Sequence, residues 1–132
     1  MVNGRNKGAA FERQVAKMLH DELGVAFKRD LEQYRAADHG DLIPDDDAFP
    51  FTLELKRYAS GVGCKPQWWE QVKRACVETG KLPCVIYKYD RQDIRCVVPF
   101  TALHAAFGSE HRCDYQAEMT FEAFCYLVRE MM

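Results

Sequence analysis

The chain has 132 residues and a formal net charge of −2; 48% of its residues are hydrophobic and 29% are charged. This size and composition indicate one globular domain with enough apolar material for a core. They exclude a membrane span of roughly 20 apolar residues, an apolar signal-peptide core, and a protein that coats DNA by net positive charge. We therefore expect a cytoplasmic protein.

Charge is unevenly distributed along the chain. An acidic segment lies between two basic ones, as in a metal-dependent enzyme that acts on a polyanion: carboxylates gather a cation while flanking Lys and Arg meet phosphates. Chance clustering in a short chain is the alternative. Net charge is +2 over residues 1–35, −6 over 36–55, +5 over 56–95 and −3 over 96–132.

The first half of the chain predicts a helix followed by short strands. Phe11, Val15 and Leu19 form one apolar stripe at helical spacing, so residues 8–23 predict a helix that Gly24 ends. The segments that follow predict a short strand (25–30), a polar loop (31–41), a strand edge stopped by Pro44 (41–44), an acidic turn (45–49) and a strong strand (50–58).

The second half predicts a further helix and a strand pair. Pro66 occupies the favoured first position of a helix that Gly80 closes, and the two glycines of the preceding loop indicate flexibility. The predicted segments are that loop (59–65), the helix (66–79), a buried strand (82–90), its antiparallel partner (94–99), a short helix (100–107) and a terminal helix (120–131) with Thr120 as N-cap.

The order of these elements predicts an α/β domain with a central mixed β-sheet flanked by helices. One domain covers residues 1–132, with a core at about 5–100 and a C-terminal helical extension at about 101–132. The extension contains no recognised motif and is expected to be a dimer element or an added cap. The six cysteines show no C-x-x-C spacing, so we expect small buried apolar residues rather than disulfides or zinc ligands.

The predicted strand "FTLELKRY" carries a carboxylate and an ammonium on one face. Side chains alternate across a strand, so Thr52, Glu54 and Lys56 point one way, opposite the apolar face. One interpretation is a half-exposed strand with a polar outer face. The other is a site that needs both charged groups on a rigid element.

A hairpin across the acidic turn would bring Asp41 beside Glu54. Two adjacent carboxylates repel unless a cation or a shared proton lies between them. Mg²⁺ held by one or two carboxylates, waters and a substrate phosphate is the ordinary solution. Lys56 on the same face could then position and help deprotonate an attacking water, or stabilise charge on the phosphate.

At these residues the chain resembles the restriction-endonuclease-like PD-(D/E)XK nuclease superfamily. The segments "GDLIP" and "LELKRY" are similar to its P-D…(D/E)-x-K motif, with a glycine in place of the proline before Asp41. The segment "KGAAFERQVAKML" is similar to the first helix of archaeal- and phage-type Holliday junction resolvases, and "WWEQVKRA" to the helix after the E-x-K strand. The resemblance covers about residues 5–100.

The resemblance implies a restriction-endonuclease-like fold and a Mg²⁺-dependent endonuclease, with Mn²⁺ as a substitute, acting in DNA recombination and repair. Its substrate would be a four-way junction, cut by a homodimer because two symmetric cuts call for two sites related by a two-fold axis. A phage or other prokaryotic origin would fit such a small resolvase. The alternatives are a restriction-like or repair nuclease that cuts duplex, flap or single-stranded DNA, and a catalytically silent DNA-binding module of the same fold.

The resemblance also implies which residues form the site. Asp41, Glu54 and the backbone carbonyl of Leu55 would bind the metal, with Glu12 as a further candidate ligand. His39, in the loop before Asp41, is either a general base or an ordinary exposed residue. The implied catalytic residues are Glu12, Asp41, Glu54, Lys56 and Gln71.

Six basic residues are candidates for DNA contacts. Arg13 follows Glu12 on the first helix, and either Arg29 or Arg35 would be the second phosphate-binding arginine. The full set is Lys7, Arg13, Arg29, Arg35, Arg57 and Lys73.

Apolar segments near the C-terminus predict a dimer. Trp68 shares a helical stripe with Val72 and is expected in the core, whereas Trp69 is left for a dimer contact or for stacking on a base. Together with Trp69, the segments "VVPF" and "TFEAFCYLV" exceed what a small monomer core needs. A dimer that buries part of this surface is therefore expected.

Overall fold

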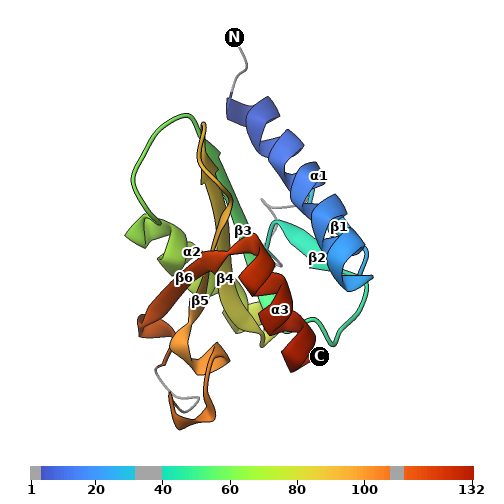
Figure 1. The fold of residues 1–132 in the computed structure, drawn as a ribbon, viewed down its shortest axis with the longest axis vertical. Helices are drawn as coiled ribbons and strands as arrows, with labels where there is room; N and C mark the ends of the chain where they lie inside the picture. Colours follow the sequence, from blue (N-terminus) through green and yellow to red (C-terminus); the bar gives the residue numbers. More distant parts are fainter. Residues whose placement is uncertain (1–3, 32–39, 108–111) are drawn as a thin grey trace.

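The computed structural model describes residues 4–31, 40–107 and 112–132. In these ranges a six-stranded sheet is flanked by three α-helices (Figure 1). The elements are α1 (Gly4–Leu23), β1 (Phe27–Arg29), β2 (Leu42–Pro44), β3 (Phe51–Tyr58), α2 (Pro66–Thr79), β4 (Leu82–Tyr89), β5 (Arg95–Pro99), three short 3₁₀ helices (Phe100–Ala102, Ala105–Phe107 and Arg112–Asp114), β6 (Gln116–Thr120) and α3 (Phe121–Met131).

The sheet is mixed, and its strands follow one another in chain order. β3 and β4 run parallel over their full length and are joined by the crossover helix α2, whereas every other neighbouring pair is antiparallel. β2 pairs with β3 at a single position, Leu42 opposite Leu53. The predicted α/β domain with a central mixed sheet flanked by helices is thereby confirmed.

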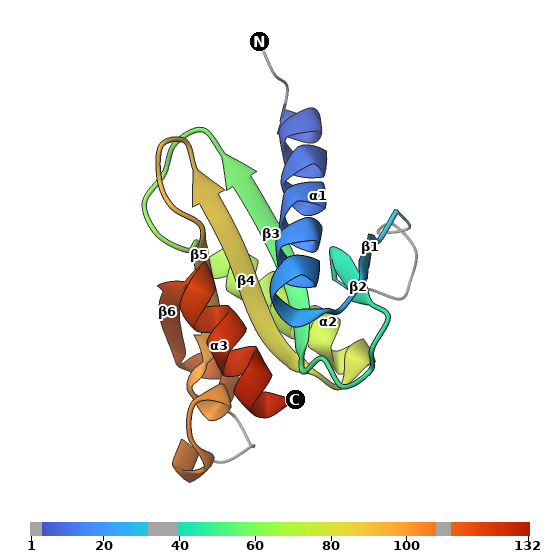
Figure 2. The same cartoon turned by 45° about the vertical axis from the view of Figure 1, so that its right-hand side comes forward.

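Helices cover both faces of the sheet. Figure 2 shows α1 and α3 on one face and α2 on the other. The apolar stripe of α1 and the buried residues of α3 pack against Phe51, Leu53 and Leu55, while α2 packs its tryptophans against β4. As a result Thr52 and Glu54 are only 2% and 1% exposed. The interpretation of β3 as a half-exposed strand with a polar outer face is therefore wrong.

Local signals place the helix ends well. α1 begins at Gly4, earlier than expected, and Gly24 adopts a positive φ of 72° as its amide donates to the carbonyl of His20 (2.9 Å). Gly80 ends α2 in the same way. Thr120 is the N-cap of α3, and its Oγ1 accepts a hydrogen bond from the amide of Ala123 (3.1 Å), as the sequence predicts.

The C-terminal segment completes the sheet rather than adding only helices. Its strand β6, which the sequence analysis missed, pairs with all of β5, and α3 buries Phe124, Cys125 and Val128 in the core shared with α1. Trp69 is buried too, and its Nε1 donates to the carbonyl of Cys113 (2.6 Å). These side chains are used within one chain, so they do not provide the surplus apolar surface from which a dimer was expected.

Loop 59–65 is anchored, although its glycines suggested flexibility. The hydroxyl of Tyr89 donates to the carbonyl of Gly63 (2.7 Å), and the amide of Asp90 donates to the carbonyl of Ala59 (3.2 Å). A Cβ at Gly61 would lie 2.4 Å from the Tyr89 ring. The missing side chain of Gly61 therefore lets the loop pack closely against Tyr89 at the end of β4.

The cysteines are free thiols, as predicted. Cys84, Cys96 and Cys125 are buried, and burial raises the pKa of each. The remaining three are half-buried. None of the helices in the described ranges is long and apolar enough to cross a membrane.

Candidate active site

The site begins where β2 and β3 diverge. The amide of Asp41 donates to the carbonyl of Leu53 (2.7 Å). Two residues further along β3, the hydrogen bond between the two segments runs to a side chain instead of the backbone. Here the amide of Leu55 donates to Oδ2 of Asp41 (2.6 Å), so a carboxylate occupies the place of a strand partner. The hairpin expected to bring Asp41 to β3 is present. Its two strands separate at Asp41 and Leu55, and this point of separation is the fork.

Gly40 allows this close approach. Its φ of 84° is a left-handed conformation, and a Cβ there would lie 2.6 Å from the carbonyl oxygen of Leu53. A proline, whose ring holds φ near −65°, could not adopt it. The glycine that replaces the motif's proline before Asp41 is therefore required by the backbone.

We expect Gly40→Ala to destabilise the fold and to reduce activity, because the new methyl group would push Asp41 away from β3. The left-handed backbone alone costs an L residue about 1–3 kcal/mol. Gly24→Ala is a matched control, since its φ is also positive and its Cβ would meet nothing within 4 Å. Chemical denaturation should show a larger loss of stability for Gly40→Ala, and only that variant should lose the nuclease activity that the resemblance implies. Equal losses of stability would contradict the role of the contact with Leu53.

Two carboxylates, Asp41 and Glu54, meet at the fork, and a third, Glu12, lies near them. Glu54 lies within hydrogen-bond reach of Asp41, and the charge of Glu12 on α1 also acts on it. The pKa of Asp41 is raised to about 6, chiefly by burial and in addition by the charge of Glu12, whereas the amide of Leu55, the hydrogen bond with Glu54 and the charge of Lys56 oppose the rise. Ionising Asp41 in this surrounding is costly, and a nearby cation would favour its ionised form.

Glu12 is held by an arginine. Nε of Arg29 on β1 donates to Oε1 of Glu12 (2.8 Å), and both side chains are mostly buried. The pair ties the first helix to the edge of the sheet. Arg29, a predicted phosphate contact, thus also orients the carboxylate of Glu12.

Lys56 and Gln71 meet above the carboxylates. Nζ of Lys56 donates to Oε1 of Gln71 (2.8 Å), which links β3 to α2. The amide oxygen fixes the direction of the flexible lysine side chain without neutralising its charge. The sequence predicts that Lys56 and Gln71 share a site with Asp41, and the structure places all three in one cleft.

These groups line a cleft of about 320 Å³. In the described part of the chain, no three His, Cys, Asp or Glu side chains converge as a closed metal cage would. The donor set instead fits a hard cation held by carboxylate and carbonyl oxygens and by water. Glu54 lies beneath the lining, next to Asp41. The lining residues are Gly8, Glu12, Asp41, Leu55, Lys56, Arg57, Tyr58 and Gln71.

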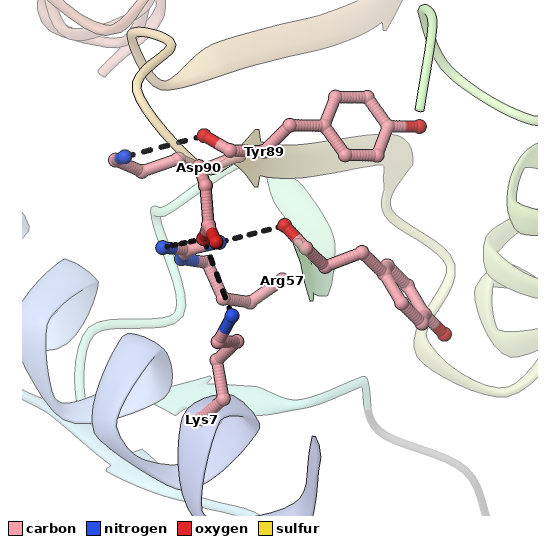
Figure 3. Close-up of polar contacts among 6 residues, drawn as sticks. Lys7, Arg57, Tyr89 and Asp90 are labelled. Carbon is pink, nitrogen blue, oxygen red and sulfur yellow. Dashed lines mark hydrogen bonds and ion pairs between the residues drawn. The ribbon is translucent and has the colours of Figure 1, made fainter. Parts of the chain in front are cut away.

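Two predicted DNA contacts are joined at the rim by Asp90, at the turn after β4. An Nη atom of Arg57 lies 2.7 Å from Oδ1 of Asp90, and Nζ of Lys7 lies 3.2 Å from the same oxygen (Figure 3). These pairs lower the pKa of Asp90. One carboxylate thus holds two cations together, and the cluster keeps a net positive charge.

The other basic candidates lie elsewhere or outside the described residues. Arg13 is exposed next to Glu12 but does not line the cleft. Lys73 is paired with Asp114 (3.1 Å) and Glu70 (3.2 Å), away from the fork. Arg35 and His39 lie outside the described residues.

Sequence reasoning missed two residues of this region. Tyr58 lines the cleft, and strand alternation from Glu54 and Lys56 would have placed it on the same face. Asp90 had no such signal, because its partners are on other elements.

Comparisons with known proteins find matches of two kinds, a protein family and solved structures. A family described as "Phage putative PDDEXK endonuclease" matches residues 3–130. A solved structure of Hjc, a Holliday junction resolvase from the archaeal hyperthermophile Archaeoglobus fulgidus, superposes with a TM-score of 0.59 at 14% identity, covering 93% of this chain and 99% of that one. The second match identifies a shared, restriction-endonuclease-like fold. No curated protein matches the sequence significantly.

Proposed function

Because this chain belongs to the phage PDDEXK endonuclease family, we propose that it is a divalent-metal-dependent endonuclease that hydrolyses phosphodiester bonds in DNA. One observation carries the proposal: a buried Asp41–Glu54 pair lies at the floor of a cleft beside Lys56, with Arg57 at its rim. Carboxylates for a cation thus meet an ammonium and a guanidinium group for a phosphate in one place.

The residues take the following parts. Asp41, Glu54 and the carbonyl of Leu55 would hold Mg²⁺ or Mn²⁺, with Glu12 as a further ligand, since these oxygens suit a hard cation. When bound, the metal supplies positive charge for the phosphate and lowers the pKa of a water molecule. Lys56, directed by Gln71, stabilises charge on the scissile phosphate and orients the attacking water.

DNA would reach this site along a basic rim. Lys7 and Arg57, held by Asp90, offer cations beside the cleft, and Arg29 adds a third charge near Glu12. Such contacts with phosphates position the DNA without reading its sequence. Arg13 and Lys73 would extend the path if the DNA crosses the first and second helices. Arg35 remains a predicted DNA contact outside the described residues.

The proposed substrate is a four-way DNA junction, and the proposed acting form is a homodimer. The fold shared with Hjc, which is described as a Holliday junction resolvase, supports this choice. Two symmetric cuts require two sites related by a two-fold axis. The competing functions are a nuclease for duplex, flap or single-stranded DNA and a catalytically silent DNA-binding module.

A cleavage panel tests the function. The protein is incubated with a four-way junction, a flap, a duplex and a single strand of matched sequence, with Mg²⁺ or with EDTA. We expect metal-dependent cleavage that is fastest on the junction and leaves symmetric paired nicks, from a protein that sediments as a dimer at micromolar concentration. Faster cleavage of flap or duplex would favour the competing nucleases, and binding without cleavage would favour the silent module.

A further inference from the structure

Three side chains of β3 form a row that leads out of the cleft. Glu54, Lys56 and Tyr58 alternate onto the same face of the strand, so neighbours in the row are separated by two residues, or about 7 Å. Glu54 is buried, Lys56 is half-buried and Tyr58 is 45% exposed. A DNA strand that runs along β3 with a phosphate at Lys56 would have an adjacent nucleotide near Tyr58.

The ring of Tyr58 is held in a fixed orientation. It stacks on the ring of Trp68, with 5.6 Å between centroids and only 6° between ring planes. Trp68 is itself buried and contacts the rings of Tyr87 and Tyr89. The exposed tyrosine is thus the outermost member of an aromatic cluster whose other rings are in the core.

Positive charge surrounds this ring. Nζ of Lys65 lies 5.5 Å from the centroid of Tyr58 and 5.7 Å from that of Trp68. Nη1 of Arg57 donates to the carbonyl of Tyr58 (2.7 Å). An aromatic surface with cations beside it suits a nucleotide, whose base is a flat π system and whose phosphate is an anion.

We propose that Tyr58 is a stacking platform for an unpaired base next to the scissile phosphate, and that it gives the protein a preference for DNA with unstacked bases. The inference rests on the proposed action on DNA and adds a determinant of substrate class. Bases inside a duplex have both faces covered by their neighbours, whereas bases at a branch, a flap or a single strand can turn a face toward the protein.

The effect should be confined to DNA that offers such a base. Stacking of a base on an aromatic side chain is worth about 1–3 kcal/mol, so Tyr58→Ala should weaken binding of unpaired DNA by roughly tenfold or more. Binding of intact duplex should change less than about twofold, because Lys7 and Arg57 remain. Tyr58→Phe keeps the ring and should retain the affinity of the wild type.

The test is equilibrium binding in EDTA, which prevents metal-dependent cleavage. The probes are a flap carrying 2-aminopurine at the first unpaired position and a blunt duplex of the same sequence. Stacking quenches the probe, so wild type and Tyr58→Phe should quench it and Tyr58→Ala should not. Tyr58→Leu, which keeps an apolar cover over Trp68, should behave like the alanine variant. Val77→Ala is the matched control, since Val77 is an 83% exposed apolar residue that does not line the cleft.

The outcomes separate this inference from the proposed function. It is overturned if Tyr58→Leu or Tyr58→Ala lowers flap and duplex affinity equally, or leaves both unchanged with quenching intact. A purely structural role of Tyr58 would lower the melting temperature of the leucine variant without changing the flap-to-duplex ratio. If wild type cleaves none of the substrates with Mg²⁺ but the ratio depends on the ring, the nuclease proposal fails and the stacking platform stands.

Discussion

Glu54→Gln and Asp41→Asn should each reduce DNA cleavage to background while leaving DNA binding within several-fold of the wild type. Each change removes a charged oxygen donor from the pair at the floor of the cleft and preserves its shape. A neutral amide holds a divalent cation far less well than a carboxylate does. Affinity for DNA could rise slightly, because negative charge near the phosphates is removed.

Cleavage with Mg²⁺ and binding in EDTA measure these effects separately. A third measurement is the rise in melting temperature on adding Mg²⁺, which wild type should show and both variants should lose. Asp47→Asn is the control, because the exposed Asp47 in the acidic turn loses the same charge and does not line the cleft. Wild-type cleavage rates in Glu54→Gln or Asp41→Asn would remove both residues from the metal site.

Lys56→Met should lower the cleavage rate by a factor on the order of 10² or more, as removal of one preorganised charge-stabilising group does in other enzymes. The ammonium is directed by Gln71 toward the space above Asp41, so it can act on a phosphate there. Lys56→Arg should recover little, because a planar, forked guanidinium cannot occupy the place of a compact ammonium.

Single-turnover cleavage at saturating Mg²⁺ checks this expectation, with DNA affinity measured in parallel. Binding should change much less than the rate, since Lys56 is one of several cations on the DNA path. Lys28→Met makes the same replacement on the exposed face of β1 and should leave the rate unchanged. If Lys56→Met cuts within a few-fold of wild type, the lysine has no part in the chemistry.

Local signals in the sequence predicted most of the elements. The stripe of Phe11, Val15 and Leu19, the proline that starts α2 and the cap at Thr120 all act within a few residues, so their consequences can be derived without the fold. β6 was missed because "QAEMT" has little strand character of its own. It forms a strand because β5 offers it a free edge.

Part of the site was also predicted from local signals. Spacing on one strand predicted that Glu54 and Lys56 share a face, and a short turn predicted that Asp41 returns beside them. The ion pairs of Asp90 and the fixed ring orientation of Tyr58 could not be derived in this way. Asp90 meets Lys7 from a position 83 residues away, and Tyr58 is held in place by Trp68 on a helix.

Residue type and strand period are local properties, so the chain alone predicts the candidate residues for the proposed chemistry. How buried these residues are and what holds them depends on the fold: α2 covers the face of Glu54, Gly40 fits against Leu53, and Arg29 orients Glu12. The fold also turned apolar segments near the C-terminus into core. The physical reason is that burial and electrostatic pairing depend on elements far apart in the chain, which no local pattern of residues encodes.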